Sequence, residues 1–250
     1  MATANNDLFS VEFFDLQLRF ARRVAEITEV SFAEAVGSHT NIYVRLGMGQ
    51  GGVDLTNSDW QDYLGELATV HEKAEYTHAV HARRRHVPTG PTLADAVGCF
   101  SYALVGQNRA RLHFHPGERT SESPLSIENR QLRQRELAIL LSKLSAASSE
   151  SMRIVGASWL YNLRSYRSLF PEPYLASLQP MAHPYQRMPL WGQFLTRDRC
   201  VRPEAQARFL EGVANASSLS ELDLCFPFSV LTTTSPAKCF YNRIGLQARQ

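Results

Sequence analysis

The stretch from residue 107 to residue 115 constrains the fold most, because apolar and polar side chains alternate along it. A period of two predicts a β-strand with one buried face and one polar face. The apolar face carries Ala110, Leu112 and Phe114, and the polar face carries Arg109, Arg111, His113 and His115. The preceding segment also has strand character and ends at the turn residues 106–108, so the sequence predicts a hairpin over residues 99–115.

The distribution of apolar residues predicts an α+β fold with a mainly antiparallel central sheet and long helices packed on it. The hairpin 99–115 and a strand at 153–161 are expected to belong to this sheet. Apolar residues recur every three or four positions in 11–28 and in 126–147. This spacing predicts two amphipathic helices whose apolar faces need the sheet as a partner.

A chain of 250 residues is long enough to bury a full core, and we expect one domain over residues 1–250. Prolines recur between residues 170 and 203, which predicts a long irregular connection and a possible subdomain boundary there. Further helices are expected at 203–215 and 219–225. The segment 40–46 fits a strand or a helix.

The composition, with 44% hydrophobic residues and a net charge of +2, is that of a soluble globular protein. The basic residues are spread along the chain, so nucleic acid is not an expected partner. No stretch has 18 uninterrupted apolar residues and the N-terminus lacks a signal-peptide pattern, so we expect no membrane partner and a cytoplasmic location. The cysteines are far apart in the sequence and are expected to be reduced and buried. They are Cys99, Cys200, Cys225 and Cys239.

The polar face of the predicted strand is the main candidate site. Guanidinium groups form paired hydrogen bonds with carboxylates and phosphates, so Arg109 and Arg111 are expected to bind an anionic substrate. His113 is the candidate general acid or base. Arg45 is a further candidate anion contact. These residues predict an enzyme that acts on a small anionic metabolite, and the sequence indicates no particular cofactor.

A second group of candidate substrate-binding residues follows the strand predicted at 153–161. Trp159, Tyr161 and Asn162 combine apolar bodies with polar ends. Side chains of this kind commonly line small-molecule pockets. Aromatic residues on a core strand would explain the same pattern, so a purely structural role for these residues stays open.

The residues His113, His115 and Glu118 resemble the first metal-binding motif of the cupins, in which His-x-His is followed by Glu. The resemblance implies a metal-dependent enzyme that uses these three ligands. Here the Glu comes one residue earlier than in that motif. We expect no bound metal, because two arginines immediately upstream would repel a cation.

Residues 230–246 resemble the last motif of the acetyl-CoA-dependent N-acetyltransferases, in which a strand is followed by an Asn-x-x-Ala-x-x-Phe-Tyr helix and a glycine. Thr234 stands in the place of the asparagine. The resemblance implies an acyl-CoA-dependent N-acyltransferase. The pyrophosphate-binding loop of that superfamily is missing from the segment 201–207, where we expected it.

A non-catalytic accessory or protein-binding module is the competing class of function. The irregular stretch 170–203 contains several aromatic residues that could form a partner surface. They are Tyr174, Tyr185, Trp191 and Phe194. A loop packed over the core is the alternative interpretation, and the exposure of these side chains separates the two.

Overall fold

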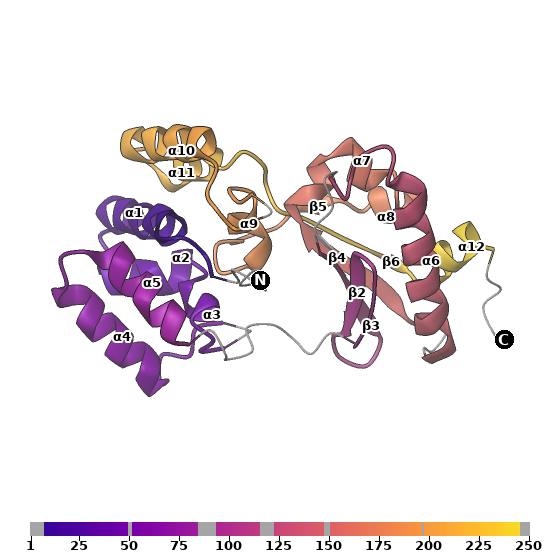
Figure 1. The fold of residues 1–250 in the computed structure, drawn as a ribbon, viewed down its shortest axis with the longest axis horizontal. Helices are drawn as coiled ribbons and strands as arrows, with labels where there is room; N and C mark the ends of the chain where they lie inside the picture. The colour runs from indigo at the N-terminus through magenta and orange to yellow at the C-terminus, as the bar shows by residue number, and fades with distance from the viewer. Residues whose placement is uncertain are drawn as a thin grey trace, which may run out of the picture. The chain divides into compact units, whose positions relative to one another are not determined.

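The computed structural model describes residues 8–49, 52–84, 94–115, 123–147, 151–196 and 198–245. The chain divides into two compact units. Unit 1 comprises residues 1–90 and 183–228, and unit 2 comprises residues 91–182 and 229–250. The chain therefore passes between the units three times, as the ribbon shows (Figure 1). The single-domain organisation expected from the sequence stays a prediction.

The described part of unit 1 is built from helices. They are α1 (Val11–Thr28), α2 (Phe32–His39), α3 (Ile42–Arg45), α4 (Ser58–Thr69), α5 (Lys73–Arg83), α9 (Met188–Gly192), α10 (Pro203–Asn215) and α11 (Leu219–Leu224). The helices predicted at 11–28, 203–215 and 219–225 are confirmed as α1, α10 and α11. The segment 40–46 contains a short helix, α3, and not a strand.

Helix α1 contacts α2, α5, α10 and α11. Its apolar face, which includes Phe13, Phe20 and Val24, is buried. The packing of this helix on the sheet, as predicted from the sequence, is not confirmed. Helices of its own unit cover the apolar face, so the hydrophobic effect that demands a partner is satisfied there.

The irregular stretch 170–203 buries the aromatic residues that were candidates for a partner surface. Tyr174, Tyr185, Trp191 and Phe194 are all buried. The ring of Trp191 lies 5.6 Å from that of Phe20, and the ring of Tyr174 lies 4.8 Å from that of Phe240. These side chains pack into the cores of their units and do not form an exposed aromatic surface, which corrects that expectation.

Unit 2 contains a mixed six-stranded sheet of order β1-β2-β3-β4-β6-β5. The strands are β1 (Ala94–Val97), β2 (Phe100–Leu104), β3 (Arg109–Phe114), β4 (Arg153–Ser158), β5 (Gln179–Pro180) and β6 (Leu231–Pro236). The strands β3 and β4 are parallel, and the other neighbouring pairs are antiparallel. The chain therefore has an α+β fold, as the sequence predicted.

The helices of unit 2 follow the strands along the chain. They are α6 (Arg130–Ala147), the 3-10 helix η1 (Trp159–Asn162), α7 (Arg164–Arg167), α8 (Glu172–Leu175) and α12 (Lys238–Arg243). The predicted helix 126–147 begins four residues late, because residues 124–129 form turns and bends. No helix in the described part of the chain has the length and apolarity needed to cross a membrane.

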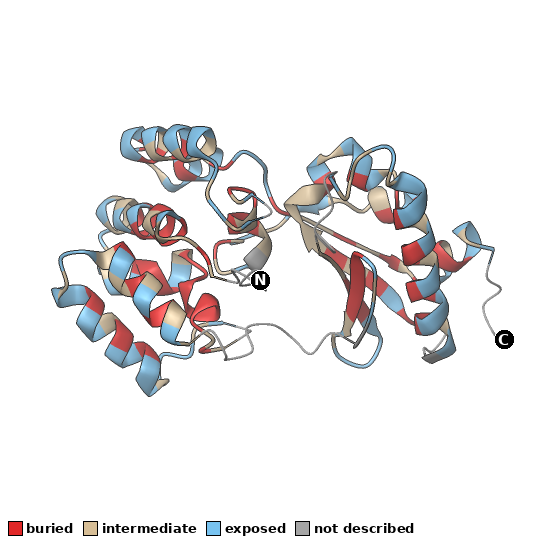
Figure 2. Ribbon diagram, in the orientation of Figure 1, coloured by how far each residue is buried: buried red, intermediate tan, exposed pale blue. Residues whose placement is uncertain are grey.

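The predicted hairpin is confirmed as β2 and β3, with Phe100 paired to Phe114 and Leu104 paired to Ala110. Its turn contains Gly106 at φ +69°, a conformation that favours glycine. Ala110 and Leu112 are buried, and they belong to a core that also contains Leu137, Leu140, Leu141 and Leu144 of α6. Figure 2 shows buried residues along the strands and along one side of α6. The alternating pattern therefore fixes which face of β3 meets the helix.

Candidate functional site

The polar face of β3 carries the candidate residues in the predicted order. Arg109 is exposed at the start of the strand, and Arg111 and His113 are half-buried. The ring of His113 lies 6.4 Å from that of His115, with 18° between the two planes. Ser101 is the β2 residue paired with His113, and its hydroxyl lies 2.7 Å from Nε2 of His115. The structure therefore brings the two imidazoles together beside a buried serine.

Both imidazoles are held in the neutral form. Burial, followed by the nearby His115 and Arg111, lowers the pKa of His113 to about 4. Burial also lowers the pKa of His115. The Nε2 atom of His113 is enclosed and has no hydrogen-bond partner. At neutral pH this imidazole is therefore unprotonated, and the imidazolium that would donate a proton is scarce.

The described residues contain no group of three or more His, Cys, Asp or Glu side chains that could hold a metal ion. Glu118, the third ligand of the cupin-like motif, lies outside the described residues. The metal-binding set of His113, His115 and Glu118 therefore stays a prediction, and so does the expectation that no metal is bound.

The candidate residues after β4 lie in η1. Tyr161 is buried, and its hydroxyl lies 2.8 Å from that of Tyr174. Asn162 is exposed, and its Nδ2 donates to the carbonyl oxygens of Trp159 at 2.7 Å and Ser229 at 2.9 Å. Both polar groups hold the chain after β4 in place. Their predicted contact with a substrate stays a prediction.

Arg45 lies at the end of α3 in unit 1, whereas the other candidate residues lie in unit 2. Its side chain is buried, and its guanidinium carbon lies 4.1 Å from the centre of the Phe9 ring. The sequence left strand or helix open for this segment, and the predicted contact of Arg45 with an anion stays a prediction. The helical conformation places the side chain among the aromatic residues of the unit 1 core.

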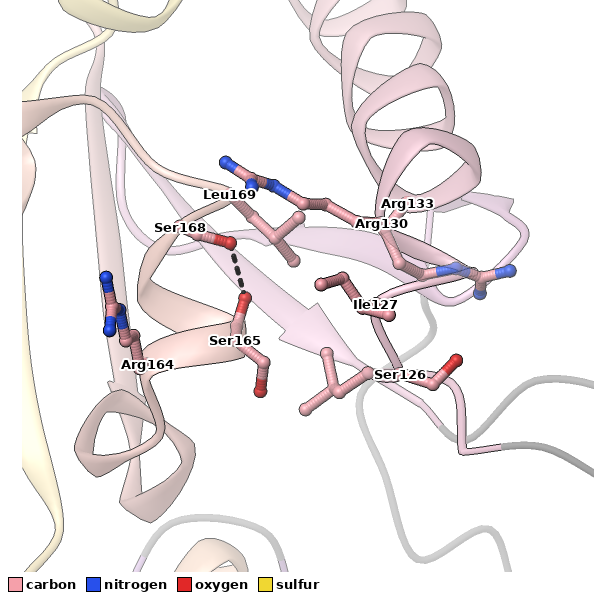
Figure 3. Close-up of a pocket in the computed structure, with 9 residues that line it drawn as sticks. Ser126, Ile127, Arg130, Arg133, Arg164, Ser165, Ser168 and Leu169 are labelled. Atoms are coloured by element: carbon pink, nitrogen blue, oxygen red, sulfur yellow. Dashed lines mark hydrogen bonds between the residues drawn. The ribbon is translucent and has the colours of Figure 1, made fainter.

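A pocket of about 380 Å³ lies in unit 2, between the start of α6 and the segment around α7. It is lined by Leu125, Ser126, Ile127, Arg130, Arg133, Arg164, Ser165, Ser168 and Leu169. Figure 3 shows these side chains, together with the hydrogen bond that Ser168 Oγ donates to the Ser165 carbonyl at 2.8 Å. Among the residues that the structure describes, the lining has three guanidinium groups and no carboxylate. We call it the arginine pocket.

The arginine pocket is lined by segments that follow β3 and β4, the two parallel neighbouring strands. The turns that lead into α6 follow β3, and η1 and α7 follow β4. In open parallel α/β sheets ligands bind at the carboxyl ends of the strands, and β3 and β4 form the parallel pair of this mixed sheet. The pairing of β3 with β4 covers Arg109–Arg111 and Arg153–Val155, and the last three residues of each strand are not paired with each other.

Arg133 is fixed before any ligand binds. Its Nη1 lies 3.0 Å from Oε2 of Glu136 and also contacts Sγ of Cys99. The Glu136 carboxylate accepts a hydrogen bond from the Cys99 amide at 3.0 Å. The neighbouring Gly98 has φ +56°, and a Cβ there would lie 2.0 Å from the Glu136 carboxyl group. Glycine at this position therefore lets the carboxylate reach the start of β2.

The sequence analysis did not find the arginine pocket. An available signal was the pair Arg130 and Arg133 near the start of a helix that follows a predicted strand. The resemblance to the N-acetyltransferases places an anion-binding loop at 201–207 instead. That segment leads into α10 of unit 1.

No protein-family model matches the chain, and comparisons with curated proteins and with solved structures also found no match. The chemistry of the arginine pocket and of the β3 polar face therefore carries the functional proposal.

Proposed function

We propose that the protein is an enzyme that acts on a small anionic metabolite and holds the anionic group of this metabolite in the arginine pocket. The observation that carries the proposal is the lining of the pocket, in which Arg133 is paired with Glu136 and no described lining residue is a carboxylate that could balance Arg130 and Arg164. An anion supplies the missing negative charge. Guanidinium groups bind carboxylates and phosphates through paired, charge-assisted hydrogen bonds.

The rest of the lining defines the kind of ligand that fits. Ser126, Ser165 and Ser168 add hydroxyl groups, whereas Leu125, Ile127 and Leu169 form apolar walls. A volume of about 380 Å³ lies within the range of small-molecule sites. These features favour a metabolite with one strongly anionic end, such as a phosphate, and an apolar portion.

The polar face of β3 is a second, separate candidate site in this proposal, because its side chains point away from the face of β3 that packs on α6. There His113 is proposed to accept a proton, and Arg109 and Arg111 to contact an anionic group of the substrate. The lowered pKa keeps His113 unprotonated at neutral pH, as a proton acceptor must be, and it also makes the imidazole a weaker base than a solvent-exposed histidine. The buried hydrogen bond between Ser101 and His115 supports a rigid face, because it orients the neighbouring imidazole.

Binding of phosphate-containing probes tests the proposal. We expect Arg164→Gln to weaken binding of phosphoenolpyruvate or inorganic phosphate about tenfold or more in calorimetric titrations, because one charge-assisted contact is lost. Arg167→Gln is the matched control, because Arg167 is an exposed arginine of the same helix that does not line the pocket. Equal affinities for the two variants and the unmodified protein would show that the pocket does not bind the anion.

An acyl-CoA-dependent N-acyltransferase is the second candidate. The end of the β3–β4 pairing at Arg111 and Val155 favours it, because main-chain groups of the two strand ends are left without partners across the strands. An extended ligand such as the pantetheine arm of coenzyme A could bond to them, and its phosphates could enter the arginine pocket. Thr234, which stands in the place of the asparagine in the N-acetyltransferase motif, lies in β6, and α12 follows that strand.

Release of free coenzyme A separates this candidate from the wider proposal. Acetyl-CoA is incubated with a panel of amines, and the thiol formed is measured. An N-acyltransferase produces thiol only when an amine is present, and Arg164→Gln lowers the rate. Binding of phosphate without any acetyl-CoA binding would leave the anionic-metabolite proposal standing and remove the acyltransferase.

A further inference from the structure

Phe9 is the centre of a second basic cluster, which lies in unit 1. The guanidinium carbon of Arg45 lies 4.1 Å from the centre of the Phe9 ring, and that of Arg199 lies 5.2 Å from it. The imidazole of His81 lies 5.5 Å from the same ring, and Phe13 stacks on it at 4.7 Å. Two guanidinium groups and one imidazole therefore surround one aromatic ring.

Arg45 is enclosed, and no ion pair with a described residue compensates its charge. Only 9% of the residue is exposed, and its Nε has no hydrogen-bond partner. Among the described residues no carboxylate forms an ion pair with Arg45. A buried charge is normally paired, because cation–π contacts return less free energy than the loss of water costs.

The described group whose charge acts on Arg45 is the positive Arg199. Burial, followed by the nearby Arg199, lowers the pKa of Arg45 to about 9. Burial lowers the pKa of His81 as well, and Arg45, His78 and Arg199 add to this effect while a hydrogen bond to the Arg45 carbonyl opposes it. No carboxylate is among the groups that act on either pKa.

The backbone holds Arg199 in an unusual conformation. Its φ is +61°, which side chains other than glycine rarely adopt. The tight loop is closed by a bridge between Leu195 and Val201 and by a hydrogen bond from the Thr196 amide to the Cys200 carbonyl at 2.8 Å. Strain of this kind persists where the surroundings impose it, and it is often found at binding sites.

We propose that Arg45 and Arg199 form an oxyanion-binding site beside Phe9, with the free Nε–H of Arg45 as a main donor. The ligand class is a carboxylate or phosphate group, whose oxygen atoms accept from a guanidinium and neutralise the enclosed charge. The site lies in unit 1, and it is independent of the arginine pocket of unit 2.

Nitrogen NMR of the arginine side chains tests the site directly. The Nε–Hε signal of Arg45, assigned by its loss in Arg45→Met, is followed while inorganic phosphate or acetate replaces chloride at constant ionic strength. We expect a saturable change at Arg45. Arg22 is the matched control, because it is an exposed arginine 5.9 Å from the Phe32 ring in the same unit. Its signal should not change.

Thermal unfolding of variants supplies a second measurement. All variants carry Arg164→Gln, which weakens the contribution of the arginine pocket to the phosphate effect equally in each of them. We expect phosphate to raise the unfolding midpoint of this parent. Arg45→Met should lose that rise and should be at least as stable as the parent in chloride alone, because an unpaired buried charge is removed. Arg45→Lys keeps the charge and should bind phosphate about tenfold more weakly.

The proposal fails if phosphate and acetate leave the Arg45 signal unchanged, or if chloride shifts it equally. It also fails if Arg45→Met keeps the full response to phosphate. If that variant does not fold, the signal of the unmodified protein and the Arg45→Lys titration decide the matter. Phosphate binding at Arg45 without any effect of Arg164→Gln on phosphate or phosphoenolpyruvate binding would support this site and contradict the arginine pocket.

Discussion

Replacement of Glu136 by Gln tests how the Arg133 guanidinium is held at the arginine pocket. The two side chains are about nine-tenths buried, with 9% and 11% of their surfaces exposed, and their charged atoms lie 3.0 Å apart. Removal of one charge from a buried pair leaves the other without compensation, which costs about 3–5 kcal/mol. The Gln oxygen can still accept from the Cys99 amide, so we expect a loss of about 3 kcal/mol in the free energy of unfolding.

The double variant Glu136→Gln/Arg133→Met separates charge pairing from general damage to the core. Each single variant leaves one buried charge, whereas the double variant leaves none. We therefore expect the double variant to lose less stability than either single variant, with a coupling of up to about 3 kcal/mol. A phosphate-containing ligand should stabilise Glu136→Gln more than the unmodified protein, because the ligand replaces the lost negative charge.

Hydrogen exchange of the β2 and β3 amides is the appropriate assay, because it reports on unit 2 alone in a chain with two compact units. The exchange is measured by mass spectrometry under conditions in which rates follow the opening equilibrium. A loss below about 0.5 kcal/mol for Glu136→Gln would refute the reasoning, since exposed substitutions have effects of that size. The reasoning would also be refuted if the double variant lost as much free energy of unfolding as the two single variants together.

Three further predictions follow from the packing and protonation of unit 2. Gly156→Ala should destabilise the protein by about 1–3 kcal/mol in the same exchange assay, because a Cβ would lie 2.0 Å from the Tyr161 hydroxyl. Gly98→Ala should cost at least about 1 kcal/mol, since its φ is +56° and the Cβ would overlap the Glu136 carboxyl group. His113 should titrate with a pKa of about 4 in NMR spectra. The unfolded chain binds this proton near pH 6.5, so stability should fall from pH 6.5 to pH 4, and less steeply in His113→Asn.

The hairpin and several helices could be predicted from the sequence because their signals are local. The alternation that ends at Phe114 defines β3, and the recurrence of apolar residues defines α1 and α10. The polar face with Arg111 and His113 follows directly from the same alternation. Side chains that share a strand face are neighbours in any tertiary structure, because the backbone itself sets their spacing.

The arginine pocket could not be predicted in this way, because its residues come from separate segments. Arg130 and Arg133 belong to α6, whereas Arg164 follows β4. They share a pocket because β3 and β4 are parallel neighbours. No local periodicity encodes such a pairing, since it depends on which strand edges meet once the chain has folded.

The sequence by itself determined the period of each element and therefore which side chains it can bury. Only the tertiary structure decided which partners cover those faces. Helix α1 meets the helices of unit 1, although its apolar face is equally suited to a sheet. The tertiary structure also decided that Arg45 is buried beside Phe9. Hydrophobic burial has no preferred direction, so a local pattern specifies the need for a partner and leaves the identity of the partner to the fold.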